Sequence, residues 1–191
     1  VIDWQQVKAA GIDFAILRLG FRGMTEGGLN VDATFEENYQ GATAAGLKVG
    51  VYFFSQAITP EEARQEADYV LSLLESYPIT CPVVYDWEPI TFAEGARTDQ
   101  LEHEVLTQCA AAFCQRVAQA GYTPAVYFNQ EMGYFSFDLK ELSPFQFWLA
   151  EYDSYPSFYY GFTLWQYTHE GRVDGIQTPV DWNLDFSQLK R

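Results

Sequence analysis

The sequence predicts a single α/β domain over residues 1–191, arranged as a small, irregular TIM-like β/α barrel with a strand-rich C-terminal third. Over the first two thirds, near-continuous apolar runs alternate with amphipathic segments, a pattern typical of βα units around a parallel sheet. Short strands then follow one another without helices, an order that a doubly wound sheet would not give. With 48% hydrophobic residues, a chain of this length can bury a substantial core.

Each expected element is bounded by local signals. Helices are predicted where a 3.6-residue apolar period lies between N-terminal capping residues and C-terminal glycines. They cover residues 4–10, 32–45, 60–76 and 99–120. Strands are predicted where β-branched and aromatic residues run between turn signals. They cover residues 14–20, 48–55, 82–88, 124–129, 145–152, 162–168 and 180–183. The C-terminal ends of such strands carry the active site in β/α barrels.

Charge and composition exclude several classes of function. The net charge of −15 argues against a nucleic-acid partner, which requires a basic surface, and against binding to anionic membranes. No apolar run is long enough to span a bilayer, and no signal peptide is recognisable. We therefore expect a monomer that contacts neither nucleic acid nor membrane.

The cysteines and histidines offer no catalytic or metal pattern. Cys81, Cys109 and Cys114 lack metal-ligand spacing and are expected to be buried free thiols. His103 and His169 lie in polar surroundings away from the predicted strand ends, so a histidine nucleophile, a metal site and a cofactor are not expected.

The strongest chemical signal is the pair Asp86 and Glu88, at the end of the apolar strand that begins at Pro82. Because side chains alternate faces along a strand, both carboxylates are expected to project to the same side. Pro89 ends the strand directly after them. About one such triplet is expected by chance in a chain of this composition, so a solvated strand end is the alternative interpretation.

Other polar and aromatic residues also fall at predicted strand ends. They are Tyr52, Tyr127, Asn129, Trp148, Glu151, Tyr152, Trp165, Gln166, Asp181 and Asn183. An aromatic content of 17% suits a sugar-binding groove, and a tyrosine-rich packed core is the alternative. The convergence of these residues on one end of the domain favours a glycan-binding site there.

Over nearly its whole length, the chain resembles the lysozymes of glycoside hydrolase family 25, which are N-acetylmuramidases of bacterial and phage origin. The resemblance rests on motifs that occur in the family's order, including Asp86-Trp87-Glu88. The others cover residues 2–4, 7–16, 35–38, 44–47, 49–55, 148–152, 165–167 and 180–183.

The resemblance implies that Glu88 is the general acid for cleavage of the β-1,4 bond between N-acetylmuramic acid and N-acetylglucosamine in peptidoglycan. Asp86 is expected to stay ionised and to raise the pKa of Glu88. Two residues of strand rise separate their backbones by about 6.5 Å, between the retaining and inverting ranges, so spacing leaves the stereochemistry open. The resemblance favours substrate-assisted retention, with Asp86 or Asp181 orienting the 2-acetamido group. The alternative interpretation of Asp181 is a loop residue that caps its neighbour Asn183.

The resemblance also implies a substrate groove formed by Tyr52, Tyr127, Trp148, Tyr152, Trp165 and Gln166. For each aromatic residue, burial in the core is the alternative. Arg18 is expected either to pair with an active-site carboxylate or to lie on an outward face. The expected partner is the peptidoglycan glycan strand, which implies a secreted or cell-wall-associated protein.

The chain departs from the family pattern at its start. Members ordinarily begin with a strand that reads roughly Gly-Ile-Asp-Val-Ser, whose Asp belongs to the active site. This chain begins after it, and Asp3 is expected to be a helix cap. Either the sequence omits that segment or the gap is real. Phe53 stands where many relatives carry His, which could alter the groove. A non-catalytic peptidoglycan-binding relative and a chitinase-type glycosidase are the alternative functions.

Overall fold

The computed structural model describes residues 1–187 and contains five helices and eight strands within them. The strands are β1 (Phe14–Arg22), β2 (Leu29–Val31), β3 (Lys48–Phe54), β4 (Val83–Asp86), β5 (Pro124–Asn129), β6 (Gln146–Ala150), β7 (Leu164–Gly171) and β8 (Val180–Asp185). The helices are α1 (Trp4–Ala9), α2 (Phe35–Ala44), α3 (Pro60–Leu74), α4 (His103–Gln119) and α5 (Gln130–Phe135).

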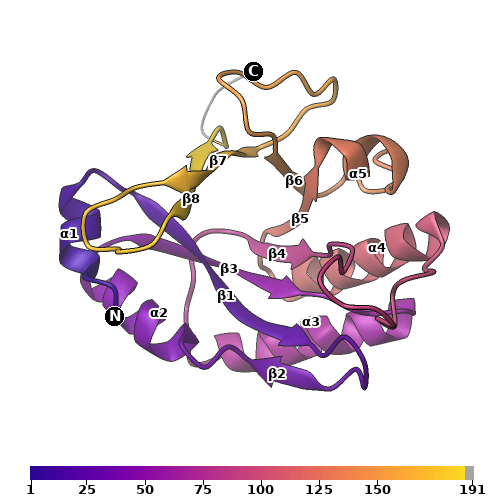
Figure 1. The fold of residues 1–191 in the computed structure, drawn as a ribbon. Helices are drawn as coiled ribbons and strands as arrows, with labels where there is room; N and C mark the ends of the chain where they lie inside the picture. Colours follow the sequence, from indigo (N-terminus) through magenta and orange to yellow (C-terminus); the bar gives the residue numbers. More distant parts are fainter. Residues whose placement is uncertain (188–191) are drawn as a thin grey trace.

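All eight strands belong to one curled sheet, in the order β2-β1-β3-β4-β5-β6-β7-β8 (Figure 1). The strands from β1 through β7 in this order pair in parallel, whereas β2 and β8 pair antiparallel at the two edges. The α/β class is therefore confirmed. The sheet does not close into a full barrel, because β8 pairs only with β7 in the described part of the chain.

Local signals explain where most helices begin. The Asp3 carboxylate accepts hydrogen bonds from the backbone N–H groups of Gln5 and Gln6, which confirms Asp3 as the cap of α1. Thr59 caps α3 in the same way, and Pro60 occupies its first turn. No helix among residues 1–187 is long and apolar enough to cross a bilayer.

The expected elements differ from the structure at several boundaries; β4 ends at Asp86 rather than at Glu88, and β7 runs to Gly171 rather than to residue 168. Helix α4 begins at His103 rather than near residue 99, and no side chain caps its start. The sequence analysis missed β2, whose three residues are too few to show a period, and α5, whose six residues follow β5 directly. All three cysteines are free thiols, but only Cys109 and Cys114 are buried, since Cys81 is partly exposed.

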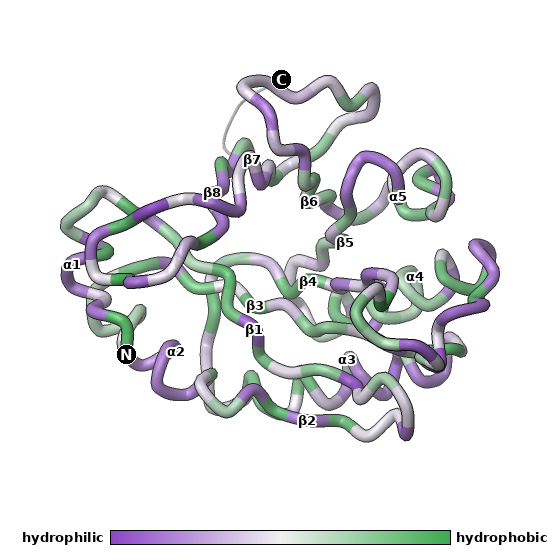
Figure 2. Tube along the Cα trace, viewed as in Figure 1, coloured by the Kyte–Doolittle hydropathy of each residue, from purple (hydrophilic) through white to green (hydrophobic). Residues whose placement is uncertain are grey.

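Alternation along the strands separates an outer from an inner apolar cluster, and a third cluster packs α1 and α2 against the sheet. The outer face of the sheet packs against α3 and α4 through residues such as Phe53, Tyr85 and Leu149. The inner face carries a smaller cluster that includes Val84 and Trp148. Hydropathy along the chain follows this division, with apolar segments concentrated in the central strands (Figure 2). The inner face is therefore left free to carry a site.

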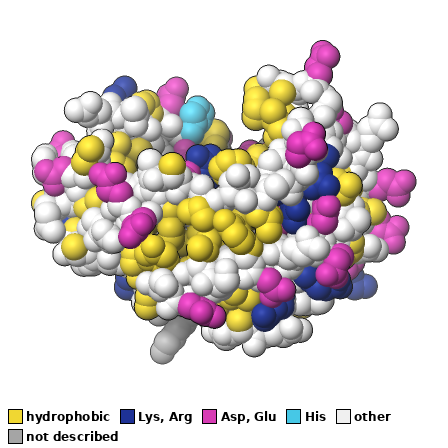
Figure 3. All heavy atoms as spheres, turned by 90° about the horizontal axis from the view of Figure 1, so that it is seen from below, with side chains coloured by type: hydrophobic (Ala, Val, Ile, Leu, Met, Phe, Trp, Pro, Cys, Tyr) yellow, Lys and Arg dark blue, Asp and Glu magenta, His cyan; other side chains and the backbone are white. Residues whose placement is uncertain are grey.

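The surface of the molecule is hollowed on one side. Viewed from below, hydrophobic side chains gather in a band across the middle, and a notch divides the upper edge (Figure 3). Strands β1 and β8 also line opposite sides of one large pocket, which continues to the end of β4.

Candidate active site

Strand register brings the central residues of the site together on the inner face of the sheet. Asp86, the last residue of β4, lies opposite Tyr127 on β5, which in turn lies opposite Trp148 on β6. On the neighbouring strand β3, Tyr52 lies two residues before the position opposite Asp86 and therefore points to the same inner face. Arg18 on β1 lies opposite Tyr52. These five side chains line a pocket of about 880 Å³ together with Glu88, Gln166, Asp181, Trp182 and Asn183.

Asp86 is almost fully buried, with 6% of its surface exposed. Its Oδ1 atom is buried and has no hydrogen-bond partner among the described residues. Burial raises the pKa of Asp86 well above its ordinary value, and the charge of Glu88 raises it further, whereas Arg18 opposes the rise. A carboxyl group in this state can gain a hydrogen bond only from something that enters the pocket.

Glu88 follows β4 in the loop toward α4 and is partly buried. Burial raises its pKa, and the charge of Asp181 on β8 adds to the increase. Asp181 itself lies at the exposed rim, where partial burial raises its pKa and His169 lowers it. The charge of Asp181 thus favours the protonated form of Glu88, and the charge of Glu88 favours the protonated form of Asp86.

The expected division of charge between Asp86 and Glu88 was wrong for the ligand-free protein. An ionised Asp86 was expected to raise the pKa of Glu88. Instead, burial penalises the charged form of Asp86 itself, and the pKa of Glu88 is raised by burial and by the charge of Asp181.

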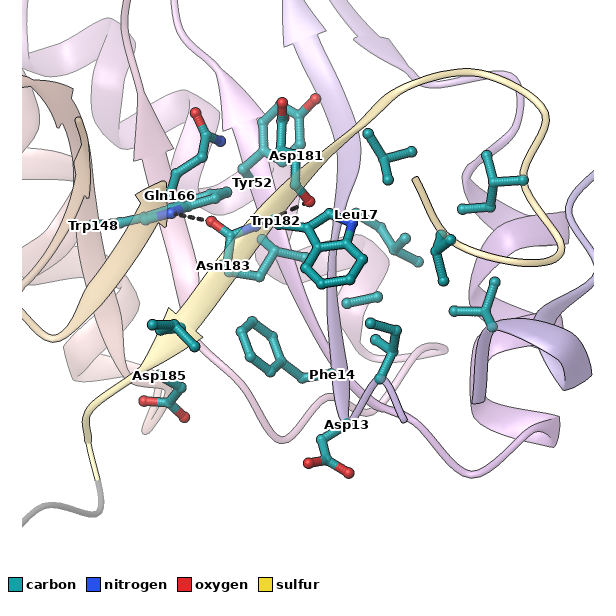
Figure 4. Close-up of a pocket in the computed structure, with 18 of the residues that line it drawn as sticks. Asp13, Phe14, Leu17, Tyr52, Trp148, Gln166, Asp181, Trp182, Asn183 and Asp185 are labelled. Carbon is teal, nitrogen blue, oxygen red and sulfur yellow. Dashed lines mark hydrogen bonds between the residues drawn. The ribbon is translucent and has the colours of Figure 1, made fainter. Parts of the chain in front are cut away.

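A hydrogen-bonded polar wall faces the carboxyl groups. The hydroxyls of Tyr127 and Tyr152 both donate to Oε1 of Gln166, at 3.0 Å and 2.8 Å. Trp148 Nε1 donates to Oδ1 of Asn183 at 2.8 Å (Figure 4). The rings of Tyr127 and Trp148 pack edge to face, 5.0 Å apart. These contacts fix the orientation of the groups that surround the pocket before any ligand binds.

The pocket has two chemically different ends. Tyr52, Gln166 and Asp181 lie at one end, and Asp13 and Asp185 lie at the other (Figure 4). Burial, with the charge of Asp86, raises the pKa of Tyr52, so its hydroxyl stays neutral. The end that holds Asp86 and Glu88 therefore combines acidic groups with neutral aromatic hydroxyls, as expected for a site that binds sugars and transfers protons.

Several residues predicted for the site have structural roles instead. Trp165 is 6% exposed, belongs to the outer core, and donates from Nε1 to the backbone oxygen of Glu151. It was wrongly placed in the groove because alternation along β7 sends Gln166 inward and Trp165 outward. The Glu151 carboxylate holds the following loop by accepting from the N–H groups of Ser157 and Phe158. Asn129 caps α5.

The structure adds His169 to the surroundings of the site and decides between the two alternatives left open for Arg18. His169 was placed away from any strand end, but β7 continues to Gly171 and brings its ring to 4.5 Å from that of Tyr152. Arg18 lines the pocket, and its Nε forms a 2.6 Å ion pair with Asp32 rather than with an active-site carboxylate. The extension of β7 brings His169 to Tyr152, and the pairing of β1 with β2 brings Asp32 near Arg18. Neither feature had a clear signal in the sequence.

Metal-ligating side chains do not assemble at this site. Within residues 1–187, no group of three or more His, Cys, Asp or Glu side chains is arranged to hold a metal ion.

A curled α/β sheet with carboxyl groups at and after the end of a strand is compatible with a glycoside hydrolase, and comparison with known families identifies this class. The model of the family described as "Glycosyl hydrolases family 25" matches residues 1–176, and the chain belongs to this family. The family predicted from sequence motifs is therefore confirmed.

Relatives and solved structures agree with this assignment. The autolytic lysozyme of Clostridium acetobutylicum is 26% identical over 98% of this chain and 52% of its own length. Lysozyme M1 of Streptomyces globisporus is 30% identical over 95% of this chain and 63% of its own length. The chain thus spans about half to two thirds of these relatives. The structure of the spore cortex lytic enzyme SleM of Clostridium perfringens, 24% identical, shares the fold with a TM-score of 0.80 over 96% of this chain and 63% of its own.

Proposed function

We propose that this domain hydrolyses peptidoglycan at the β-1,4 bond between N-acetylmuramic acid and N-acetylglucosamine, with substrate-assisted retention of configuration. The observation that carries the proposal is the buried, unpartnered Oδ1 of Asp86 beside Glu88, at the end of an aromatic-lined pocket. Membership of glycosyl hydrolase family 25 and similarity to two proteins named lysozymes support the substrate class.

In this mechanism Glu88 is the general acid. Its raised pKa keeps the carboxyl group protonated to higher pH than an exposed glutamate would allow. The proton passes from Glu88 to the glycosidic oxygen as the bond between that oxygen and the anomeric carbon breaks. The resulting Glu88 carboxylate then accepts a proton from the incoming water.

Asp86 orients the nucleophile, which is the carbonyl oxygen of the substrate's own 2-acetamido group. The acetamido N–H donates to the free Oδ1 of Asp86, and this hydrogen bond favours the ionised form of the carboxyl group. The carbonyl oxygen attacks the anomeric carbon to form a cyclic oxazolinium, which water then opens with a second inversion. We assign the orienting role to Asp86 rather than to Asp181, because Asp181 lies at the exposed rim.

The walls of the pocket position the sugar rings. Tyr52, Tyr127 and Trp148 line the pocket, and Tyr152 is linked to it through Gln166. Their aromatic faces suit the apolar faces of sugar rings, and the fixed hydroxyl and amide groups suit the sugar hydroxyls. The proposed partner is a peptidoglycan glycan strand, bound by a monomer acting at the cell wall or after secretion.

Digestion of purified peptidoglycan tests this function, with mass analysis of the released ends. The wild-type domain is expected to release fragments with reducing N-acetylmuramic acid. The Glu88→Gln variant should lose about 10²- to 10⁴-fold in rate, because it cannot donate the proton, while keeping the fold and glycan binding.

Other outcomes would redirect the assignment. Near-wild-type turnover by Glu88→Gln would contradict its role as the acid. Cleavage of chitin oligosaccharides in place of peptidoglycan would identify a chitinase-type glycosidase. A folded wild-type domain that binds the glycan without cleaving it would be a binding relative.

A further inference from the structure

A chain of exposed aromatic rings lies on α5 and on the loop that joins β6 to β7. Ring centroids are 6.3 Å apart for Tyr134 and Phe135, 6.2 Å for Tyr134 and Tyr160, and 5.3 Å for Tyr159 and Tyr160. We call these four residues the aromatic shelf. Their exposed fractions run from 40% for Tyr134 to 85% for Tyr159. Single exposed apolar residues are ordinary, whereas contiguous exposed patches mark interaction sites.

The shelf is held in place without a ligand. The backbone N–H of Tyr159 donates to the hydroxyl of Tyr134 at 2.9 Å, which ties the loop to α5. Beneath the shelf, the buried ring of Phe158 lies 4.8 Å from Tyr134 and 5.7 Å from Tyr160. Because these contacts already order the rings, a ligand that stacks on them incurs little of the usual entropic cost of ordering the surface.

The loop between β6 and β7 links the shelf along the chain to residues of the candidate active site, and Tyr134 and Tyr160 themselves line a second pocket. Tyr152, at the start of that loop, donates to Gln166 in the site, and Tyr159 and Tyr160 near its other end belong to the shelf. Glu151, directly before Tyr152, accepts through its carboxylate from the N–H groups of Ser157 and Phe158, which precede Tyr159. One buttressed segment thus links the candidate active site to the shelf along the chain.

The chemistry of the shelf fits an uncharged sugar face. All four side chains are aromatic, and three are tyrosines, which present a flat apolar face and a hydroxyl at the edge. The acidic chain, with a net charge of −15, disfavours anionic partners.

We propose that the aromatic shelf is a distal glycan subsite, which binds sugars of the substrate strand beyond those held at Glu88 and so favours long strands over short fragments. This inference rests on the proposed function, because it assumes that the pocket binds the same strand.

The direct test measures binding to purified insoluble peptidoglycan by co-sedimentation, in the Glu88→Gln background that prevents cleavage. Tyr159→Ala is expected to raise the dissociation constant about three- to tenfold through loss of stacking. Tyr159→Phe should retain the wild-type affinity, and Tyr159→Leu, which is apolar but not flat, should weaken binding like alanine. Tyr155→Ala is the matched control, since Tyr155 lies in the same loop, is exposed, and stands outside the ring chain.

A second measurement uses the active protein. Tyr159→Ala should lower the ratio of kcat/KM for long glycan strands to kcat/KM for tetrasaccharide fragments by a similar factor. Unchanged affinity and an unchanged ratio would overturn the proposal. Full affinity in Tyr159→Leu would also overturn it, because generic apolar contact rather than stacking would then suffice. A wild-type domain that cleaves nothing would refute the proposed hydrolysis alone, since the binding series would still decide the role of the shelf.

Discussion

Two buried carboxyl groups, Glu66 on the outer side of the sheet and Asp86 on the inner side, lie in contrasting environments. Glu66 is fully buried and accepts hydrogen bonds from Ser55 Oγ at 2.6 Å and Arg22 Nε at 2.7 Å. Asp86 is 6% exposed, and its Oδ1 has no partner in the described part of the chain. Burial raises the pKa of both groups, to about 7 for Glu66.

The difference separates a structural group from a functional one. Arg22 also donates to the backbone oxygens of Gly27 and Glu62, so the Glu66 ion pair joins the β1–β2 hairpin to α3. Every partner that Glu66 needs is supplied by the protein itself. Asp86 faces an open pocket with one oxygen unsatisfied, which is the state expected of a group whose partner is a ligand.

The largest expected effect is on stability. Glu66→Ala should lower the free energy of unfolding by about 3–5 kcal/mol, because it leaves Arg22 buried without its carboxylate. Urea denaturation measures the change. Exposed Glu75, at the end of the same helix, provides the control: Glu75→Ala should change stability by less than about 0.5 kcal/mol. Similar losses in the two variants would contradict a structural role for Glu66.

For Asp86 we expect a loss of activity without a loss of stability. Asp86→Asn should lower kcat/KM on peptidoglycan about 10²- to 10³-fold, equivalent to about 2.7–4 kcal/mol, because the amide cannot orient the acetamido group as a carboxylate does. Its unfolding free energy should not fall, since no hydrogen bond to Oδ1 is lost. Asp174→Asn, at an exposed position in the β7–β8 hairpin, is the matched control. Loss of stability with retained activity would reverse the contrast between the two carboxyl groups.

The smallest effect concerns pH. Since the pKa of Glu66 rises from 4.5 to about 7 on folding, the folded protein keeps a proton that the unfolded chain releases. The contribution of Glu66 is therefore fully present below pH 4.5 and declines as pH rises to about 7. Urea denaturation across this window should show a shallower decline in Glu66→Gln than in the wild type. An unchanged slope would show that Glu66 does not titrate there.

Asp86 should also make the free energy of unfolding decline as pH rises, because burial raises its pKa on folding. The decline should begin at a lower pH than for Glu66, since the ordinary pKa of Asp86 is 3.8. In a plot of the free energy of unfolding against pH, Asp86→Asn should therefore reduce the slope from a lower pH than Glu66→Gln does. Identical curves for the two variants would contradict separate titrations.

Local periodicity led to the prediction that Asp86 and Glu88 form the centre of the site, although β4 ends at Asp86 and Glu88 lies after it. Asp86 and Glu88 were assigned to one face from their two-residue spacing, and both line the pocket. The same rule, applied to strand β7, would have separated Gln166 from Trp165, but both were assigned to the groove because both stand near a strand end. The role of Glu66 had no sequence signal, since its partners Arg22 and Ser55 lie 44 and 11 residues away.

The sequence by itself determined the α/β class, most element positions, the family and the acidic pair, because these depend on short-range periodicity, caps and motif order. Only the tertiary structure decided which carboxyl groups are satisfied, that His169 approaches Tyr152, and that four exposed rings of α5 and the β6–β7 loop form the aromatic shelf. Those properties depend on which distant segments pack together and how much water they exclude. Burial and partner geometry set pKa values and binding surfaces, and neither is encoded in the spacing of neighbouring residues.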